Sequence, residues 1–224
     1  MTLALSQLDL ALTFSDSECL FEKLCSDIEQ QGYSINPMAL PLALADGLLQ
    51  QANTLQEQAF EPAGIGRNEQ HLMNNFVRSD EIVWINGESR AESAWLDWSN
   101  SLKRYLNRRL YLGLFSFESH FASYKAGHFY KRHLDAFHGQ TNRVLSLVVY
   151  LNKDWQAEDG GELVLYRDEH DKTGTRVTPG FATLVAFLSE SFPHEVLPAK
   201  RERLSIAGWF SVNQSINNQL NPPT

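Results

Sequence analysis

From Phe115 onward the chain consists of short segments in which apolar and polar residues alternate. A period of two places successive side chains on opposite faces of a β-strand. Turn residues such as Asp159-Gly160-Gly161 separate the segments. The predicted strands are Ser119–Lys125, Tyr130–Ala136, Arg143–Leu151, Glu162–Tyr166, Thr175–Thr178, Ala182–Phe187, His194–Pro198 and Leu204–Val212. Short strands with regular turns predict a jelly-roll barrel, or double-stranded β-helix.

The preceding residues follow a helical period instead. Helices are predicted from about Ser15 to a break at Gly32–Pro37, over Pro41–Gln58 and over Glu92–Leu110. A short strand, Ile82–Ile85, lies before the last of these helices. The segment Glu61–Arg78, with its proline and glycines, is predicted to be a long loop.

These patterns together predict an all-β core with flanking helices, in the α+β class. We expect one domain over residues 1–224. Residues 1–114 would supply helical support and a mobile loop, and residues 115–214 would form the jelly-roll core, packed against the N-terminal helices.

Charge and cysteine content indicate which cellular compartment and which binding partners to expect. The formal net charge of −8 makes nucleic acid an unlikely partner, because non-specific nucleic-acid binders are usually basic. Cys19 and Cys25 form no metal-binding motif and are expected to be free thiols in a reducing compartment. No secretory signal or membrane-spanning run is recognised, so a cytoplasmic location without membrane contact is expected.

Three residues in the predicted barrel suit a metal ion. His133 and Asp135 are two apart and would share one face of a strand, and His194 begins a strand that a jelly-roll can bring alongside. Two histidines and one carboxylate form the facial triad of non-haem Fe(II) oxygenases. The remaining histidines, His71, His120, His128, His138 and His170, are assigned to the surface or to packing.

Arg203, at the start of the last predicted strand, suggests an anionic ligand. A guanidinium in an apolar barrel needs a negative partner, and its fork matches a carboxylate. A dicarboxylate that also reaches the metal would provide one, with the Tyr150 hydroxyl as an additional donor. The alternative is that Arg203 pairs with an internal Asp or Glu.

The stretch Arg78–Val212 resembles the 2-oxoglutarate- and Fe(II)-dependent prolyl 4-hydroxylases, especially the hypoxia-inducible-factor type and its bacterial counterparts. The matching motifs are Arg78-Ser79-Asp80 before Trp84, Tyr130–Asp135, Tyr150–Trp155, Gly160–Leu163, Phe192–Val196 and Arg203–Trp209. Several independent motifs in the right order are far more specific than a single His-x-Asp match.

The resemblance implies a role for each matching residue. His133, Asp135 and His194 would bind Fe(II), with no catalytic side chain beyond these ligands. The expected 2-oxoglutarate pocket consists of Arg203, Tyr150, Tyr124 and Leu163. The residues expected to face the substrate are Tyr130, Arg143, Trp209 and Asp80, and Glu61–Arg78 would be the loop that folds over it.

By the same resemblance, the reaction would hydroxylate a prolyl residue of a protein and convert 2-oxoglutarate and O2 to succinate and CO2. L-Ascorbate is implied as a supporting reductant. The expected partner is a protein with an accessible proline, such as the translation factor elongation factor Tu. Two alternatives stay open: an AlkB-like nucleic-acid demethylase, and a non-catalytic metal-binding barrel that senses a ligand.

Overall fold

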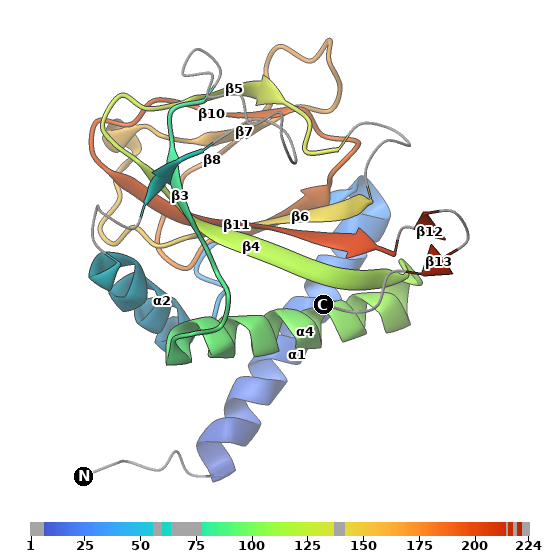
Figure 1. Cartoon of the computed structure of the whole chain (residues 1–224). Coiled ribbons are helices and arrows are strands. Elements are labelled where there is room, and N and C mark those ends of the chain that lie inside the picture. Colours follow the sequence, from blue (N-terminus) through green and yellow to red (C-terminus); the bar gives the residue numbers. More distant parts are fainter. Residues whose placement is uncertain are drawn as a thin grey trace, which may run out of the picture.

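Two antiparallel sheets face each other, and helices cover the outer face of the larger sheet (Figure 1). The computed structural model describes residues 7–55, 60–63, 78–136, 142–213, 215–216 and 219–220, with side chains of the first helix from residue 17. The large sheet has the order β1 (Tyr33–Asn36), β9 (Leu184–Leu188), β6 (Arg143–Tyr150), β11 (Arg203–Val212), β4 (Leu114–Tyr124), β3 (Glu81–Trp84) and β2 (Glu61–Pro62).

The small sheet lies across the barrel from the large one. Its order is β5 (Tyr130–His133), β10 (His194–Val196), β7 (Leu163–Leu165) and β8 (Thr175–Val177). A separate hairpin joins β12 (Ser215–Ile216) and β13 (Gln219–Leu220). Strands distant in sequence are neighbours in both sheets, as β11 between β4 and β6 illustrates, and the predicted jelly-roll is confirmed.

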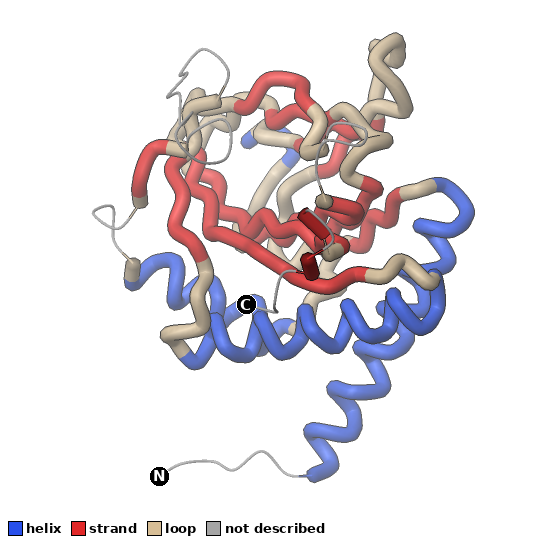
Figure 2. Tube along the Cα trace, turned by 45° about the vertical axis from the view of Figure 1, so that its right-hand side comes forward, coloured by secondary structure: helices blue, strands red, loops and turns tan. Residues whose placement is uncertain are grey.

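The helices lie together on one side of the large sheet, and Figure 2 shows them as a layer below its strands. They are α1 (Gln7–Gln31), α2 (Leu42–Thr54) and α4 (Arg90–Leu110), with a single 3-10 turn, η1 (Ala157–Asp159), elsewhere in the described chain. Ser89 caps α4 by accepting a hydrogen bond from the Glu92 amide, and Tyr111 ends it in the left-handed conformation at φ 55°. None of the described helices combines the length and apolar character required to cross a membrane.

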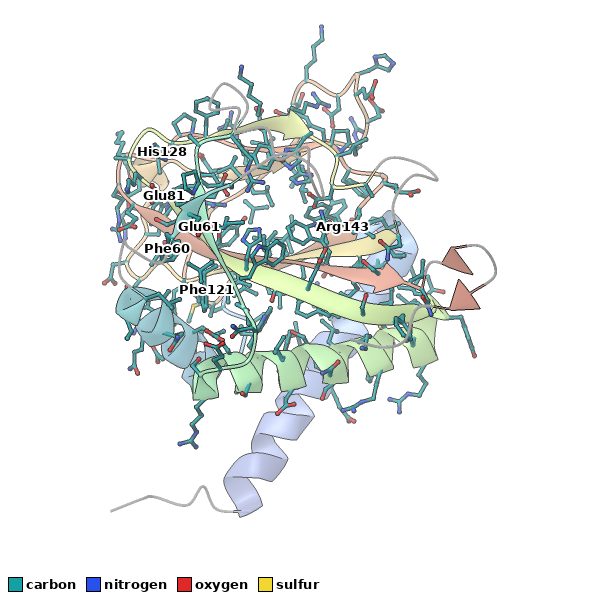
Figure 3. All side chains as sticks on the ribbon, viewed as in Figure 1. Phe60, Glu61, Glu81, Phe121, His128 and Arg143 are labelled. Carbon is teal, nitrogen blue, oxygen red and sulfur yellow. The ribbon has the colours of Figure 1, made fainter. Side chains whose placement is uncertain are left out.

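The period of two in the central strands divides the interior into two cores. On β4, for example, Phe121 packs toward the helices, while Ala122 and Tyr124 face the space between the sheets. Figure 3 labels Phe121 on the helix side of the sheet. The helix-side core includes Trp95, Leu102, Leu106, Leu145, Leu147, Val149, Ile206 and Phe210. The inter-sheet face also carries buried polar side chains, such as Ser146, Arg203 and Ser205. The candidate functional site lies on this face.

The predicted elements are mostly present with shifted ends. α1 begins at Gln7 rather than near Ser15, and α2 ends at Thr54 rather than Gln58. β4 begins at Leu114, before the predicted start at Ser119, because it pairs with β11 along nearly its whole length.

Three predicted segments differ from the observed structure. The break predicted at Gly32–Pro37 contains β1, whose register pairs Ile35 with Val185 at the edge of the large sheet. The strand predicted over Tyr130–Ala136 ends at His133, so Asp135 lies in the bend that follows it. The expected loop Glu61–Arg78 begins with β2. Its residues 64–77, which include His71, lie outside the described residues, and so does His138.

Trp95 provides a test of the helix-side core. It is completely buried, stacks on Trp98 with ring centroids 5.5 Å apart, and its indole donates to Ser119 Oγ at 3.0 Å. Replacing Trp95 with Ala should lower the free energy of unfolding by about 3–5 kcal/mol, because the cavity cannot close fully. Urea denaturation would measure this. Tyr111→Ala, at an 88% exposed position, should change it by less than about 0.5 kcal/mol, and equal losses for the two variants would contradict the assignment.

Candidate metal and cosubstrate site

His133 and His194 are brought together by the pairing of β5 with β10. They lie directly opposite each other in the register, with ring centroids 4.2 Å apart. Each Nδ1 contacts a backbone carbonyl oxygen two residues earlier, at 2.8 Å from Lys131 and at 3.0 Å from Phe192. A carbonyl can only accept, so each Nδ1 carries the proton and each Nε2 keeps a free lone pair. This is the tautomer that a histidine metal ligand requires.

Asp135 completes the cluster from the bend after β5. Its Oδ1 lies 3.7 Å from His133 Nε2, and its Oδ2 lies 3.7 Å from His194 Nε2. One ligand atom from each of the three residues lies within 4.8 Å of the others. The three donors therefore surround one point, as a single divalent ion requires. The three residues predicted from sequence spacing lie together, but the strand argument for Asp135 was wrong, because only His133 of the pair is on the strand.

The protonation states of this cluster suit a cation. Burial lowers the pKa of His194 to about 4, and the neighbouring His133 acts in the same direction, so His194 is neutral near pH 7. Burial alone would raise the pKa of Asp135. The two histidines and the hydrogen bond from Ser146 outweigh that effect and hold the Asp135 pKa below its usual range. A carboxylate beside a neutral His194 fits Fe(II), which accepts both oxygen and nitrogen ligands.

Arg203 is a buried cation on the inter-sheet face of β11, only 1% exposed. Its guanidinium lies between the rings of Tyr124 and Tyr150, 5.0 Å and 4.9 Å from their centroids. Its hydrogen bond from Nη1 to Ser205 Oγ is long at 3.4 Å, and within the described part of the chain its Nε has no hydrogen-bond partner. No Asp or Glu of that part forms an ion pair with it, so the alternative of an internal carboxylate is not observed.

The groups around Arg203 fit a carboxylate ligand. The Tyr150 hydroxyl is buried, and the Arg203 guanidinium is its nearest charged neighbour. Burial raises the pKa of Tyr150 against the opposing effect of the Arg203 charge, so the phenol keeps its proton and can donate. Leu163 belongs to the same inter-sheet cluster as Tyr124 and Tyr150. A cation that forms no ion pair with the described residues and an adjacent phenol, in an apolar surround, form a cradle for one end of a dicarboxylate.

Arg78 links Tyr130, which stacks on His133, to Asp80. The Tyr130 ring stacks on the His133 ring with centroids 3.5 Å apart, and Arg78 lies over the other face of Tyr130 at 4.5 Å. Asp80 is 2% exposed and receives two hydrogen bonds from the Arg78 guanidinium, at 2.8 Å and 2.5 Å. Asp80 thus fixes Arg78, which in turn covers Tyr130.

Arg143 and Trp209 form a second group on the inter-sheet face. The Arg143 guanidinium lies 3.8 Å from the Trp209 ring centroid and bonds Glu118 at 2.8 Å. Figure 3 shows Arg143 at the opposite end of the large sheet from Glu61 and Glu81. The Trp209 indole N–H has no hydrogen-bond partner among the described residues. The buried ring of His120 lies between Trp84 and Trp209, so its predicted packing role is observed.

Sequence reasoning missed the residues that support the site. They are Ser146 and Ser189 beneath Asp135, Phe187 against the His194 ring, Glu118 on Arg143, and the side chain of Arg78 over Tyr130. The period of two on β6 placed Ser146 on the same face as Tyr150, and that signal could have identified it. Ser189 and Phe187 could be found only once β9 was known to pair with β6.

Comparison with known proteins agrees with this geometry. The family model of the 2OG-Fe(II) oxygenase superfamily matches residues 119–211, which include the three metal-type ligands, Tyr150 and Arg203. Human Egl nine homolog 1 is 32% identical over 143 residues, covering 60% of this chain and 33% of that protein. The chain therefore spans about a third of the length of that relative.

Two solved structures extend the similarity to most of the chain. The prolyl hydroxylase of Trichoplax adhaerens, solved with a hypoxia-inducible-factor peptide fragment, is 28% identical with a TM-score of 0.78, covering 89% of this chain and 92% of that one. A Pseudomonas putida prolyl-4-hydroxylase is 36% identical with a TM-score of 0.77, covering 87% of this chain and all of that one. With that identity over the whole length of the bacterial enzyme, the chain belongs to the prolyl 4-hydroxylase family of the 2OG-Fe(II) oxygenase superfamily.

Proposed function

We propose that the protein hydroxylates a prolyl residue of a protein substrate, using Fe(II), 2-oxoglutarate and O2. The observation that carries this proposal is the cluster of His133, Asp135 and His194 in the same barrel as Arg203, a buried cation that forms no ion pair with any carboxylate of the described residues. The 36% identity with a bacterial prolyl-4-hydroxylase favours proline over the AlkB-like alternative, and the net charge of −8 gives nucleic acid no support.

Different side chains would bind the metal, the cosubstrate and the substrate. His133 and His194 would offer Nε2 lone pairs and Asp135 a carboxylate oxygen, a ligand set that would hold Fe(II) and leave room for a cosubstrate. Bound there, Fe(II) with 2-oxoglutarate and O2 supplies the oxidising chemistry that inserts one oxygen atom into a C–H bond and yields succinate and CO2. Arg203 and Tyr150 would hold the distal carboxylate of the cosubstrate.

The remaining residues would exclude water and place the proline. Leu163, Phe187 and Tyr124 are buried between the sheets and keep the cosubstrate pocket apolar. Tyr130, Arg143, Trp209 and Asp80 would line the substrate side. The Trp209 indole N–H, which has no hydrogen-bond partner within the described part of the chain, would be available to a substrate carbonyl. Burial raises the pKa of Tyr130 to about 12, so this phenol stays neutral and can donate a hydrogen bond.

Elongation factor Tu remains our proposed substrate, the cytoplasm the proposed location, and L-ascorbate the proposed reductant. The solved relative with a bound peptide supports a protein substrate in general. Free Cys19 and Cys25 are compatible with a reducing compartment, which also keeps iron in the Fe(II) state. The direct test is mass spectrometry of purified elongation factor Tu, and of a lysate, after incubation with enzyme, Fe(II), 2-oxoglutarate and ascorbate. One added oxygen on a proline supports the proposal, and addition only to other residues or to bases would refute it.

His133→Ala should abolish succinate formation and weaken Fe(II) binding, because two ligands cannot hold the ion in the same way. Succinate release measured in the presence of substrate gives the activity, and calorimetry gives the metal affinity. His170→Ala, in an exposed loop, is the matched control and should keep both. An active His133→Ala variant would rule out the proposed iron site.

Arg203→Met should weaken 2-oxoglutarate binding by about 1.5–3 kcal/mol, because a charged hydrogen-bonding partner is lost. The same variant should leave the melting temperature of the ligand-free protein unchanged or higher, since it removes a buried charge that has no carboxylate partner among the described residues. Fluorescence titration and thermal melting would measure the two effects. Arg201→Met is the control, because Arg201 lies at the surface. Unchanged cosubstrate affinity in Arg203→Met would refute the carboxylate assignment.

A further inference from the structure

The three metal-type ligands are not held in the same way. His133 and His194 lie on paired strands, and each ring is fixed by a backbone carbonyl on its own chain segment. Asp135 lies beyond the end of β5, where no strand pairing fixes its position. Its orientation therefore depends on side-chain contacts.

Ser146 makes the contact that fixes Asp135. Its Oγ lies 2.6 Å from Asp135 Oδ2, and the residue is only 1% exposed. A carboxylate accepts and a hydroxyl has one hydrogen, so Ser146 donates to Asp135. A hydrogen bond of this length to a charged group is strong, particularly where water is excluded.

Ser189 supports this contact from behind. Its Oγ lies 2.9 Å from Ser146 Oγ, and Ser189 is completely buried. Because the only hydroxyl hydrogen of Ser146 is used on Asp135, Ser189 must be the donor in this pair. The Ser189 amide also donates to the Val144 carbonyl at 3.0 Å, which fixes Ser189 beside β6. The two hydroxyls form a directed chain that ends on Oδ2.

We propose that Ser146, held by Ser189, is a positioning residue that keeps Oδ2 of Asp135 occupied and leaves Oδ1 as the oxygen offered to the metal. This inference rests on the proposed function, because it assumes that the three residues bind Fe(II). Loss of a hydrogen-bond partner behind a metal ligand typically reduces metal affinity by about 10- to 100-fold. Ser189 acts only through Ser146, so removing it should have a smaller effect.

Calorimetric titration of the full chain with Co(II), a redox-stable probe for this site, would test the proposal. Ser146→Ala should weaken Co(II) binding by about 10- to 100-fold, and Ser189→Ala by less. The double variant should bind as weakly as Ser146→Ala alone, because the contribution of Ser189 is lost with Ser146. The visible spectrum of bound Co(II) should change in Ser146→Ala, since the carboxylate is free to rotate.

Ser99→Ala is the matched control. Ser99 is also completely buried, and its hydroxyl has no hydrogen-bond partner among the described residues, so Co(II) affinity should equal that of the unsubstituted protein. Ligand-free melting temperatures show whether each variant is folded. If Ser146→Ala does not fold, Ser189→Ala, one contact farther from Asp135, still decides the question.

The outcomes separate the two claims. If the unsubstituted protein does not bind Co(II) at His133 and His194, the proposed function fails, and the role of Ser146 fails with it. If it binds but Ser146→Ala matches Ser99→Ala, only the positioning role is wrong. If Ser189→Ala reduces Co(II) affinity by the same factor in the unsubstituted protein and in Ser146→Ala, the proposed hydrogen-bond chain from Ser189 through Ser146 is wrong.

Discussion

The central strands of the large sheet are mostly buried on both faces, and their alternation decides which side chains each face receives. On β6, Leu145, Leu147 and Val149 pack against the helices. Ser146 and Tyr150 of the same strand face the space between the sheets. The helix side is a closed apolar core that stabilises the barrel. The inter-sheet side can therefore carry polar groups that contribute little to stability and serve a ligand.

Arg203 is the clearest case of a buried polar group that lowers the stability of the ligand-free protein but can bind a ligand. A completely buried guanidinium is costly when no carboxylate is near, and most proteins supply one from within. Here two tyrosine rings and one long hydrogen bond to Ser205 are its observed contacts. Arg203 lies on the large sheet, and the metal-type cluster lies on and next to the small sheet of the same barrel. The simplest occupant is therefore a molecule that binds the metal at one end and presents a carboxylate to Arg203 at the other.

Sequence patterns predicted much of this structure, for identifiable physical reasons. The alternating segments after Phe115 recur as β4 to β11, because half-buried strands require that period. β1 was missed, since Tyr33–Asn36 is short, lies between Gly32 and Pro37, and pairs with β9, about 150 residues away in the sequence. The bend at Asp135 was also missed, because a His-x-Asp spacing fits both a strand and a strand end. Ser189 had no local signal, as its role exists only through contact with Ser146.

The central claim is that His133, Asp135 and His194 hold a metal while Arg203 holds the distal carboxylate of 2-oxoglutarate. The most direct measurement is a crystal structure with Mn(II) and 2-oxoglutarate, with the metal located by anomalous scattering. The account predicts one metal peak in contact with all three residues, and a 2-oxoglutarate carboxylate hydrogen-bonded to Arg203 and Tyr150. A metal bound elsewhere, or Arg203 paired with a carboxylate of the protein itself, would contradict it.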